Sequence, residues 1–184
     1  MSAATNTSAG HVRRRPPECG SLWSAGGSGP AEPALHVVLV APEIPPNTGS
    51  IARLCAATYT RLHLIRPLGF SLEDRYLKRA GLDYWPHVDV HVHDDWPQFR
   101  QLHRHARMHF FSARAQTSYL SASYTVGDYL VFGSETKGLP AALLAAHREQ
   151  TYVVPITNHH VRSLNLSNAV SIVVYEALRQ LAGI

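Results

Sequence analysis

The chain has 184 residues, 45% of them hydrophobic, with 17 lysines and arginines, 13 acidic residues and a formal net charge of +4. This length suits one domain with a sizeable core, and the mild positive charge favours polyanionic partners such as phosphates. The two cysteines exclude a disulfide framework, and no apolar stretch reaches signal-peptide or membrane-span length, so we expect a soluble, cytoplasmic protein with no membrane partner.

Residues 1–34 differ in composition from the rest of the chain. They are rich in Ala, Ser, Gly, Pro and Thr and show no periodicity, which predicts a disordered tail followed by a single domain over residues 35–184. The run Arg13–Arg15 suits a solvated tail better than a nucleic-acid-binding arm. The scarcity of acids leaves an organellar transit peptide as a further interpretation.

From residue 35 onward, short apolar runs alternate with helical patterns. Strands are predicted at Leu35–Val40, Leu62–Ile65, Met108–Phe111, Tyr129–Phe132 and Tyr152–Val154. Helices are predicted to start near Asn47, Ser71, Asp95 and Pro140, and a last one to cover Ala169–Leu181. Continuously apolar strands are buried on both faces, so we expect an α/β fold with a mostly parallel sheet and helices on both of its faces.

The first candidate loop follows the strand at 35–40 and reads Pro-Glu-Ile-Pro-Pro-Asn-Thr-Gly. Ligands of open parallel sheets gather at the carboxyl ends of strands, where this loop would lie. Two prolines stiffen it, Asn47 can cap the following helix, and Arg53 falls on the first or second turn of that helix. A capped loop beside a surface arginine is the alternative interpretation.

Twelve histidines raise the question of a metal site. His91 and His93 would share one strand face, beside Asp94 and Asp95. Further along the chain come His103, His105 and His109. Their spacing matches no established metal site, so we expect solvated histidines on a surface helix and a strand edge, and no bound metal.

The second loop, residues 133–140, reads Gly-Ser-Glu-Thr-Lys-Gly-Leu-Pro. A phosphate-binding P-loop needs Lys and then Ser or Thr after its last glycine, but Leu139 and Pro140 stand there, which argues against ATP binding. Two glycines around polar residues favour close approach of the backbone to a small ligand. A plain strand-to-helix turn is an equal alternative.

The third loop, residues 162–168, reads Arg-Ser-Leu-Asn-Leu-Ser-Asn and runs into the last helical pattern. A helix start offers free N–H groups and the positive end of the helix dipole. One Ser or Asn suffices as a cap, yet this loop has Ser163, Asn165, Ser167 and Asn168. We expect some of these side chains to serve a ligand, the alternative being an over-polar cap.

Taken in this order, the three loops resemble those of the SPOUT (α/β-knot) RNA methyltransferases. They are most similar to the branch that 2′-O-methylates the wobble nucleotide of tRNA. The resemblance rests on residues 42–56, 132–140 and 162–177, together with Arg-Ala-Gly-Leu-Asp-Tyr at 79–84, and covers the chain from Leu35 onward. It implies a C-terminal trefoil knot, S-adenosyl-L-methionine as cofactor, a homodimer, and tRNA bound at its anticodon stem-loop.

The resemblance also implies which residues contact the cofactor. By position, Gly133 in the second loop and Ser163 and Leu164 in the third would bind S-adenosylmethionine. Phe111 and Val154, at or just after strand ends, would do so largely through their backbone.

For catalysis, the resemblance and the chemistry together single out Asn47, Arg53 and Tyr175. A guanidinium stays protonated and is a poor base, so Arg53 would bind a neighbouring phosphate and favour alkoxide character at the 2′-oxygen. Asn47 would orient the ribose or Arg53. Tyr175 would assist the hydroxyl or order the cofactor pocket, or be an ordinary tyrosine of an amphipathic helix. Phosphate contacts are expected from Arg75, Lys78, Arg79 and Arg162.

The chain departs from the family pattern at two positions of the second loop and ahead of the third, where His159 and His160 replace a different polar pair. Ser134 stands where this branch usually has proline, and Lys137 where it usually has arginine, so the bidentate fork of a guanidinium is lost there. Alternative functions are a 2′-O-methyltransferase acting on ribosomal RNA and a noncatalytic RNA-binding module. Base methylation is disfavoured because the third loop has no carboxylate to act as a base.

Overall fold

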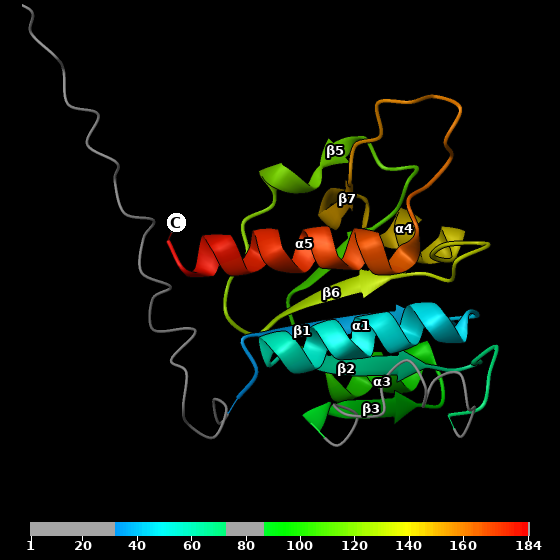
Figure 1. The fold of residues 1–184 in the computed structure, drawn as a ribbon, viewed down its shortest axis with the longest axis vertical. Coiled ribbons are helices and arrows are strands. Elements are labelled where there is room, and N and C mark those ends of the chain that lie inside the picture. Colours follow the sequence, from blue (N-terminus) through cyan, green and yellow to red (C-terminus); the bar gives the residue numbers. More distant parts are fainter. Residues whose placement is uncertain (1–31, 73–86, 184) are drawn as a thin grey trace, which may run out of the picture.

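The computed structural model describes residues 32–72 and 87–183 (Figure 1). Nearly all of the predicted tail lies outside these residues, as do most of the helix predicted after Ser71 and the stretch at 79–84. No helix in the described part of the chain is both long enough and apolar enough to cross a bilayer.

Seven strands form a single sheet. They are β1 (Leu35–Val40), β2 (Arg61–Ile65), β3 (Val90–His93), β4 (Met108–Phe111), β5 (Thr117–Ser118), β6 (Asp128–Phe132) and β7 (Thr151–Val153). Their order is β3-β2-β1-β6-β4-β7-β5, and every neighbouring pair is parallel. The predicted parallel sheet is confirmed, and each of the five predicted strands is found with ends shifted by at most one residue. The two edge strands, β3 and β5, are not among these five. The strand β3 is predicted only as the strand face shared by His91 and His93, and β5 has too few residues to carry a periodic signal.

Helices cover both faces of the sheet, as predicted. They are α1 (Pro45–Thr58), α3 (Trp96–Leu102), α4 (Ala141–Ala146) and α5 (Leu166–Leu181), with short 3-10 turns at Tyr119–Ser121 and Arg148–Gln150. The helices α1 and α5 lie side by side over one face (Figure 1). On the other face, Phe99 of α3 and Leu143 and Leu144 of α4 pack against the sheet.

The strand β1 shows how the sequence supplies both cores. Its side chains alternate between faces. Val37 and Leu39 join the core under α1 and α5, while Val38 and Val40 join the core under α3 and α4. Burying each such side chain stabilises the fold by about 1.5–3 kcal/mol. The apolar stripe of α5 is buried from Val170 to Leu178, as its 3.6-residue period predicts.

Helix caps agree with the sequence in two places and differ in a third. Asp95 caps α3 by accepting from Gln98 N at 2.7 Å, and Asn165 caps α5 by accepting from Ser167 N at 2.9 Å. The predicted Asn47 cap is wrong, because two prolines occupy the first positions of α1 and the N-cap residue is Ile44. Asn47 therefore lies inside the first turn, and its amide is left for other partners.

The expectation of solvated histidines holds only in part. His91 and His105 are exposed, and His103 is half-buried. His93 and His109, however, are buried at 8% and 2% exposure. The reason is register. Strand β3 turns His93 toward α3, and β4 lies inside the sheet with both faces covered, so neither strand presents its histidine to water.

Candidate active site

The candidate site is a cavity of about 810 Å³ at the carboxyl ends of the strands β4, β6 and β7. Asn47, in the first turn of α1 (Pro45–Thr58), and Asn165, the residue before α5, line it next to each other. Because β6, β4 and β7 are neighbours in a parallel sheet, residues that follow each of them meet at one edge. The volume lies in the range typical of small-molecule sites.

All five residues predicted to contact a cofactor line this cavity. Phe111 ends β4, Gly133 follows β6 and Val154 follows β7, while Ser163 and Leu164 precede α5. The structure therefore brings together residues that lie in four separate segments between positions 111 and 164. Their role in binding S-adenosylmethionine stays a prediction.

The second loop is closed on itself. Gly138 N donates to Ser134 O at 2.9 Å, Lys137 N donates to Ser134 Oγ at 3.2 Å, and Gly138 has a φ of +71°. A Cβ atom placed on Gly133 would lie 2.0 Å from Gly138 C and 2.1 Å from Leu139 N. The two glycines therefore allow the two ends of the loop to pack against each other, backbone on backbone. This contact is within the loop and not with a ligand.

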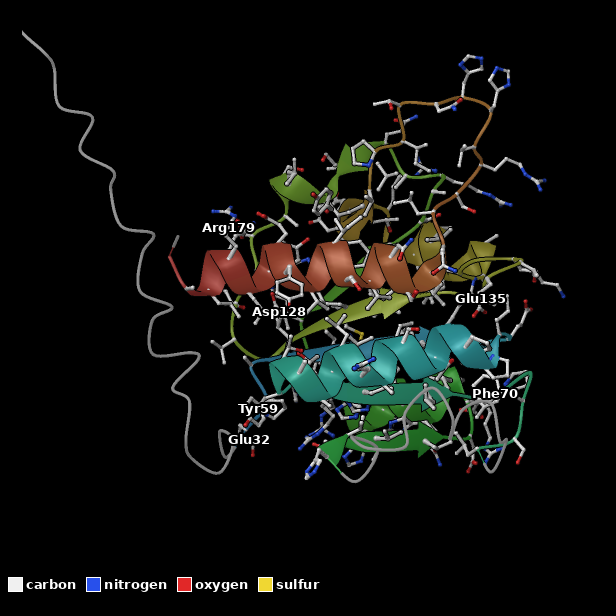
Figure 2. The ribbon with its side chains drawn as sticks, viewed as in Figure 1. Glu32, Tyr59, Phe70, Asp128, Glu135 and Arg179 are labelled. Atoms are coloured by element: carbon white, nitrogen blue, oxygen red, sulfur yellow. The ribbon has the colours of Figure 1, made fainter. Side chains whose placement is uncertain are left out.

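Glu135 joins the three loops at the mouth of the cavity. Its carboxylate accepts from Glu43 N at 2.8 Å, from Ile44 N at 3.2 Å and from Asn47 Nδ2 at 3.0 Å. Asn47 Oδ1 in turn accepts from Asn165 Nδ2 at 2.9 Å. Figure 2 shows Glu135 beside the first turns of α1 and α5. Sequence reasoning did not single out Glu135, although it is the one acid between the two glycines of the second loop.

Asn47 is thus a positioning residue in this structure. One side of its amide donates to Glu135 and the other accepts from Asn165, so the side chain links the first loop to both others. Asn165 donates to Asn47 through Nδ2 and caps α5 through Oδ1, which accepts from Ser167 N and Asn168 N, so the two helix starts are tied together. Ser167 and Asn168, also considered as caps, lie in the first turn and donate their backbone N–H groups to Asn165 instead.

The structure does not bring Arg53 or Tyr175 to the cavity of the same chain. Arg53 is exposed on α1, and Tyr175 is 54% exposed on α5. Neither lines the cavity. In one protomer these two predicted catalytic residues are therefore separate from Asn47 and from the cofactor-contact residues.

The mouth of the cavity is positively charged. Arg114, Lys137 and Arg162 line it together with one acid, Glu135, whose three hydrogen-bond donors are neutral groups. Three basic side chains therefore stand against one acidic side chain. This balance suits an anionic partner such as an RNA phosphate. Of the basic residues predicted to contact RNA, Arg162 is at the cavity, and Arg75, Lys78 and Arg79 fall outside the described residues.

Comparison with known proteins agrees with the family that the three loops resemble. The model of the SpoU rRNA Methylase family matches residues 34–175. The tRNA (cytidine(34)-2′-O)-methyltransferase of Escherichia coli K12 is 49% identical over 148 residues, covering 80% of this chain and 94% of that protein. The protein of the same name from Burkholderia ambifaria is 50% identical over 149 residues, covering 79% and 95%.

Solved structures agree. One, described as giving structural insights into the 2-OH methylation of C/U34 on tRNA, has a TM-score of 0.78 and 52% identity and covers 82% of this chain and 97% of that chain. A SpoU methyltransferase from Streptomyces viridochromogenes, in complex with AdoMet, shares the fold with a TM-score of 0.73 at 21% identity, covering 82% and 59%. The chain belongs to the SpoU rRNA Methylase family of methyltransferases.

Proposed function

We propose that this protein transfers a methyl group from S-adenosylmethionine to the ribose 2′-hydroxyl of the wobble nucleotide of tRNA, as its relatives' names describe. The observation that carries the proposal is the convergence of the three loops on one cavity, tied together by Glu135. A tRNA substrate and the free thiol of buried Cys55 also favour a cytoplasmic location. The trefoil knot implied by the resemblance is part of the same proposal.

The residues of the cavity fit S-adenosylmethionine. Apolar side chains such as Phe111, Phe132 and Leu164 suit the adenine ring, while the Ser163 hydroxyl offers a hydrogen-bonding group to a ribose. When bound, this cofactor supplies an electrophilic methyl group on a positively charged sulfur. The chain's part is to bind it through Phe111, Gly133, Val154, Ser163 and Leu164 and to align it with the RNA.

Alignment is expected to supply much of the rate. With the cofactor bound, the lining residues would hold its methyl carbon in line with the ribose 2′-oxygen. The new C–O bond would replace the S–C bond, the neutral thioether would leave, and the hydroxyl proton would pass to solvent. Well-oriented reactants can gain about 7–11 kcal/mol from positioning alone. Arg53, held near a phosphate, would favour alkoxide character at the oxygen electrostatically. Asn47 contributes by fixing the mouth of the cavity through Glu135 and Asn165.

A homodimer would bring Arg53 and Tyr175 to the reaction. The helices α1 and α5 leave Tyr59, Ile172 and Tyr175 exposed at 54%, 37% and 54%. Exposed apolar side chains on neighbouring helices favour a protein interface, and most homo-oligomers are two-fold dimers. In this arrangement each cavity would be completed by two residues of the other subunit, the partner subunit's Arg53 and the partner subunit's Tyr175.

The test is to incubate the protein with labelled S-adenosylmethionine and either total tRNA or ribosomal RNA, and to map the methylated nucleoside. Label on the 2′-oxygen of the wobble nucleotide supports the proposal. Label on a base, or on ribosomal RNA alone, contradicts it. Binding of S-adenosylmethionine without any transfer would instead indicate a noncatalytic RNA-binding module.

A further inference from the structure

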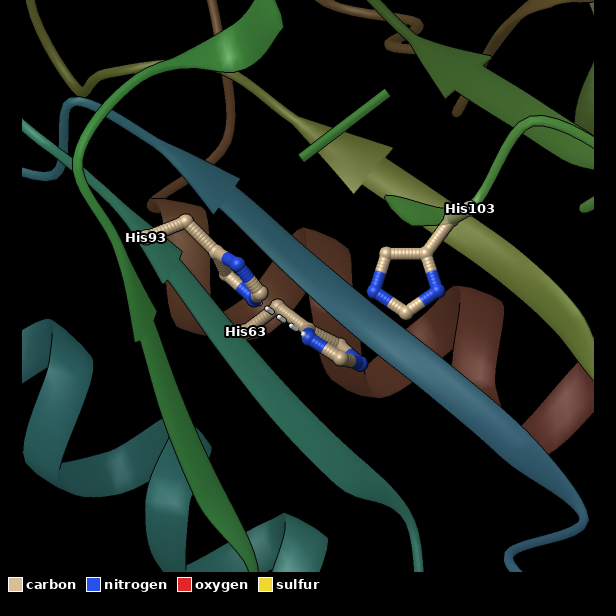
Figure 3. A group of neighbouring side chains, drawn as sticks. All are labelled: His63, His93 and His103. Carbon is tan, nitrogen blue, oxygen red and sulfur yellow. Dashed lines mark hydrogen bonds between the residues drawn. The ribbon is translucent and has the colours of Figure 1, made fainter. Parts of the chain in front are cut away.

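Three histidines meet on the face of the sheet that α3 covers, away from the candidate active site. His63 lies in β2, His93 ends β3 and His103 follows α3. One ring nitrogen of each lies within 4.8 Å of the corresponding nitrogens of the other two (Figure 3). These residues come from three separate segments, so the folding of the chain alone assembles the group.

We propose that His63, His93 and His103 bind one late first-row divalent metal ion, with Zn²⁺ as the ion to test. His63 Nδ1 and His93 Nε2 are 3.0 Å apart. Two nitrogens bound to a tetrahedral Zn²⁺ at about 2.0–2.1 Å would be about 3.3 Å apart, so the His63 and His93 rings need to move by only a few tenths of an ångström. The nitrogens of the whole group lie within 4.8 Å of one another, so His103 would close the remaining distance when the ion binds. Three imidazoles plus a water molecule complete a common zinc coordination sphere.

The surroundings orient two of the three rings for this role. Metal-binding histidines use their second nitrogen in a hydrogen bond that fixes the ring and its tautomer. His63 Nε2 is 3.0 Å from His36 Nδ1, and His103 Nδ1 is 3.0 Å from the Tyr129 hydroxyl. The nitrogen left to each ring for the metal is then Nδ1 of His63 and Nε2 of His103. The rings of His36 and Tyr129 stack at 4.0 Å, which holds both partners in place.

The chemistry of the donors also favours a metal. Within the described residues, the histidine–carboxylate pairs are His91–Asp89 and His109–Asp128, and neither includes a member of the triad. Imidazoles without carboxylates suit Zn²⁺, Cu²⁺ or Ni²⁺ better than Mg²⁺ or Ca²⁺. A hydrogen-bonded chain runs from His36 through His63 to His93, and His103 is held beside it by the Tyr129 hydroxyl and the Phe99 ring. The metal would use the free side of this arrangement, where the three rings meet.

The ion would act as a clamp and not as a catalyst. None of the three histidines lines the candidate active site. Bound to all three, the ion would fasten the edge strand β3 to β2 and to the segment after α3. This group of histidines could not be predicted from the sequence, because the register between β2 and β3 decides that His63 and His93 lie on the same face of the sheet.

The experiment uses the tag-free full chain, stripped of metal with a chelator and then titrated with Zn²⁺ or Co²⁺. We expect about one tightly bound ion per chain by elemental analysis, the visible spectrum of tetrahedral Co²⁺, and a Tm that rises with added Zn²⁺. We expect His103→Ala, at a half-buried position, to lose stoichiometric binding. The matched control His105→Ala, at an exposed position two residues away, should bind like the wild type.

A conservative variant separates metal binding from packing. Tyr129→Phe keeps the ring stacked on His36 and removes only the hydroxyl beside His103, so we expect about 10–100-fold weaker Zn²⁺ binding with the metal-free Tm nearly unchanged. The proposal is overturned if the wild type binds no Zn²⁺ or Co²⁺, or if His103→Ala binds as tightly as the wild type. Methyl transfer to tRNA should survive metal removal below the Tm, so this result is independent of the proposed function.

Discussion

Glu135, in the second loop, links the three loops by hydrogen bonds. Its carboxylate accepts from two backbone N–H groups and from the Asn47 amide of the first loop, and Asn47 in turn accepts from Asn165 of the third. Glu135→Gln replaces charge-assisted hydrogen bonds with weaker ones and puts an NH₂ group opposite a backbone donor. We expect methyl transfer to fall about 10–100-fold with the fold retained, measured as kcat and KM together with far-UV circular dichroism.

Glu149→Gln is the matched control for this change. Glu149 is exposed in the 3-10 turn before β7 and lies outside the candidate active site. We expect this variant to keep the kinetics of the wild type. Full activity in Glu135→Gln would show that the loops hold their positions without the carboxylate.

Arg53 tests the electrostatic part of the mechanism. If this guanidinium favours alkoxide character at the 2′-oxygen, Arg53→Ala should lower kcat by about 100-fold or more while S-adenosylmethionine still binds. Single-turnover methylation of tRNA and calorimetry of the cofactor measure the two effects separately. Arg104→Ala, at an exposed arginine after α3, serves as the control for lost charge. Wild-type turnover by Arg53→Ala would contradict the assignment.

Asp128 makes stability depend on pH. Burial alone would raise the pKa of this carboxyl, but hydrogen bonds from His109 and Thr125 outweigh burial and hold the pKa below its usual value. The carboxylate therefore contributes stability above its unfolded-state pKa and loses that contribution as the pH falls through its folded-state pKa. We expect Asp128→Asn to cost about 1–3 kcal/mol at pH 7 in urea unfolding.

The same difference should shrink as the pH falls below the unfolded-state pKa of about 3.9, because the unfolded chain then binds a proton that the folded carboxylate does not yet accept. Asp95→Asn is a suitable control, because Asp95 is an exposed helix cap and asparagine caps equally well. A wild-type advantage over Asp128→Asn that stays constant down to pH 3 would contradict this account.

At the level of elements, the closed second loop predicts how Gly133 behaves. Gly133→Ala puts a Cβ atom against the backbone of Gly138 and Leu139, which cannot move aside as a flexible side chain would. We expect the loop to open and the affinity for S-adenosylmethionine, measured by calorimetry, to fall by at least about tenfold, or about 1.4 kcal/mol. Gly183→Ala is strained in backbone but far from the site, and should lower the Tm without changing this affinity. Unchanged binding of S-adenosylmethionine by Gly133→Ala would show that the loop accommodates the added Cβ atom without opening, which contradicts this prediction.

Which elements could be predicted from sequence follows from how local their signals are. The strand Leu35–Val40 is predicted from its continuous run of apolar residues, and the helix α5 from the 3.6-residue spacing of its apolar side chains. The partners of Asn47 could not be predicted, because two prolines displaced the cap and its actual partners lie on distant loops. The pairing of His63 with His93 likewise depends on strand register, which period alone does not fix.

At the level of the whole molecule, the proposed dimer predicts a linked loss of assembly and activity. Ile172→Glu places a charge on the exposed face of α5 without touching the core, so we expect a monomer in size-exclusion chromatography with light scattering, and little methyl transfer. Val126→Glu, at a position 70% exposed before β6, is the control for surface charge. An active monomeric Ile172→Glu protein would show that each protomer works alone.

The hydrogen bonds around Glu135 also bear on how the protein is made. They join residues near position 44 to residue 135 and, through Asn47, to residue 165. A ribosome that stops before Asn165 therefore releases a product whose early loop lacks one of its two side-chain partners. Such a product also lacks α5, the helix that packs beside α1, so we expect it to be inactive.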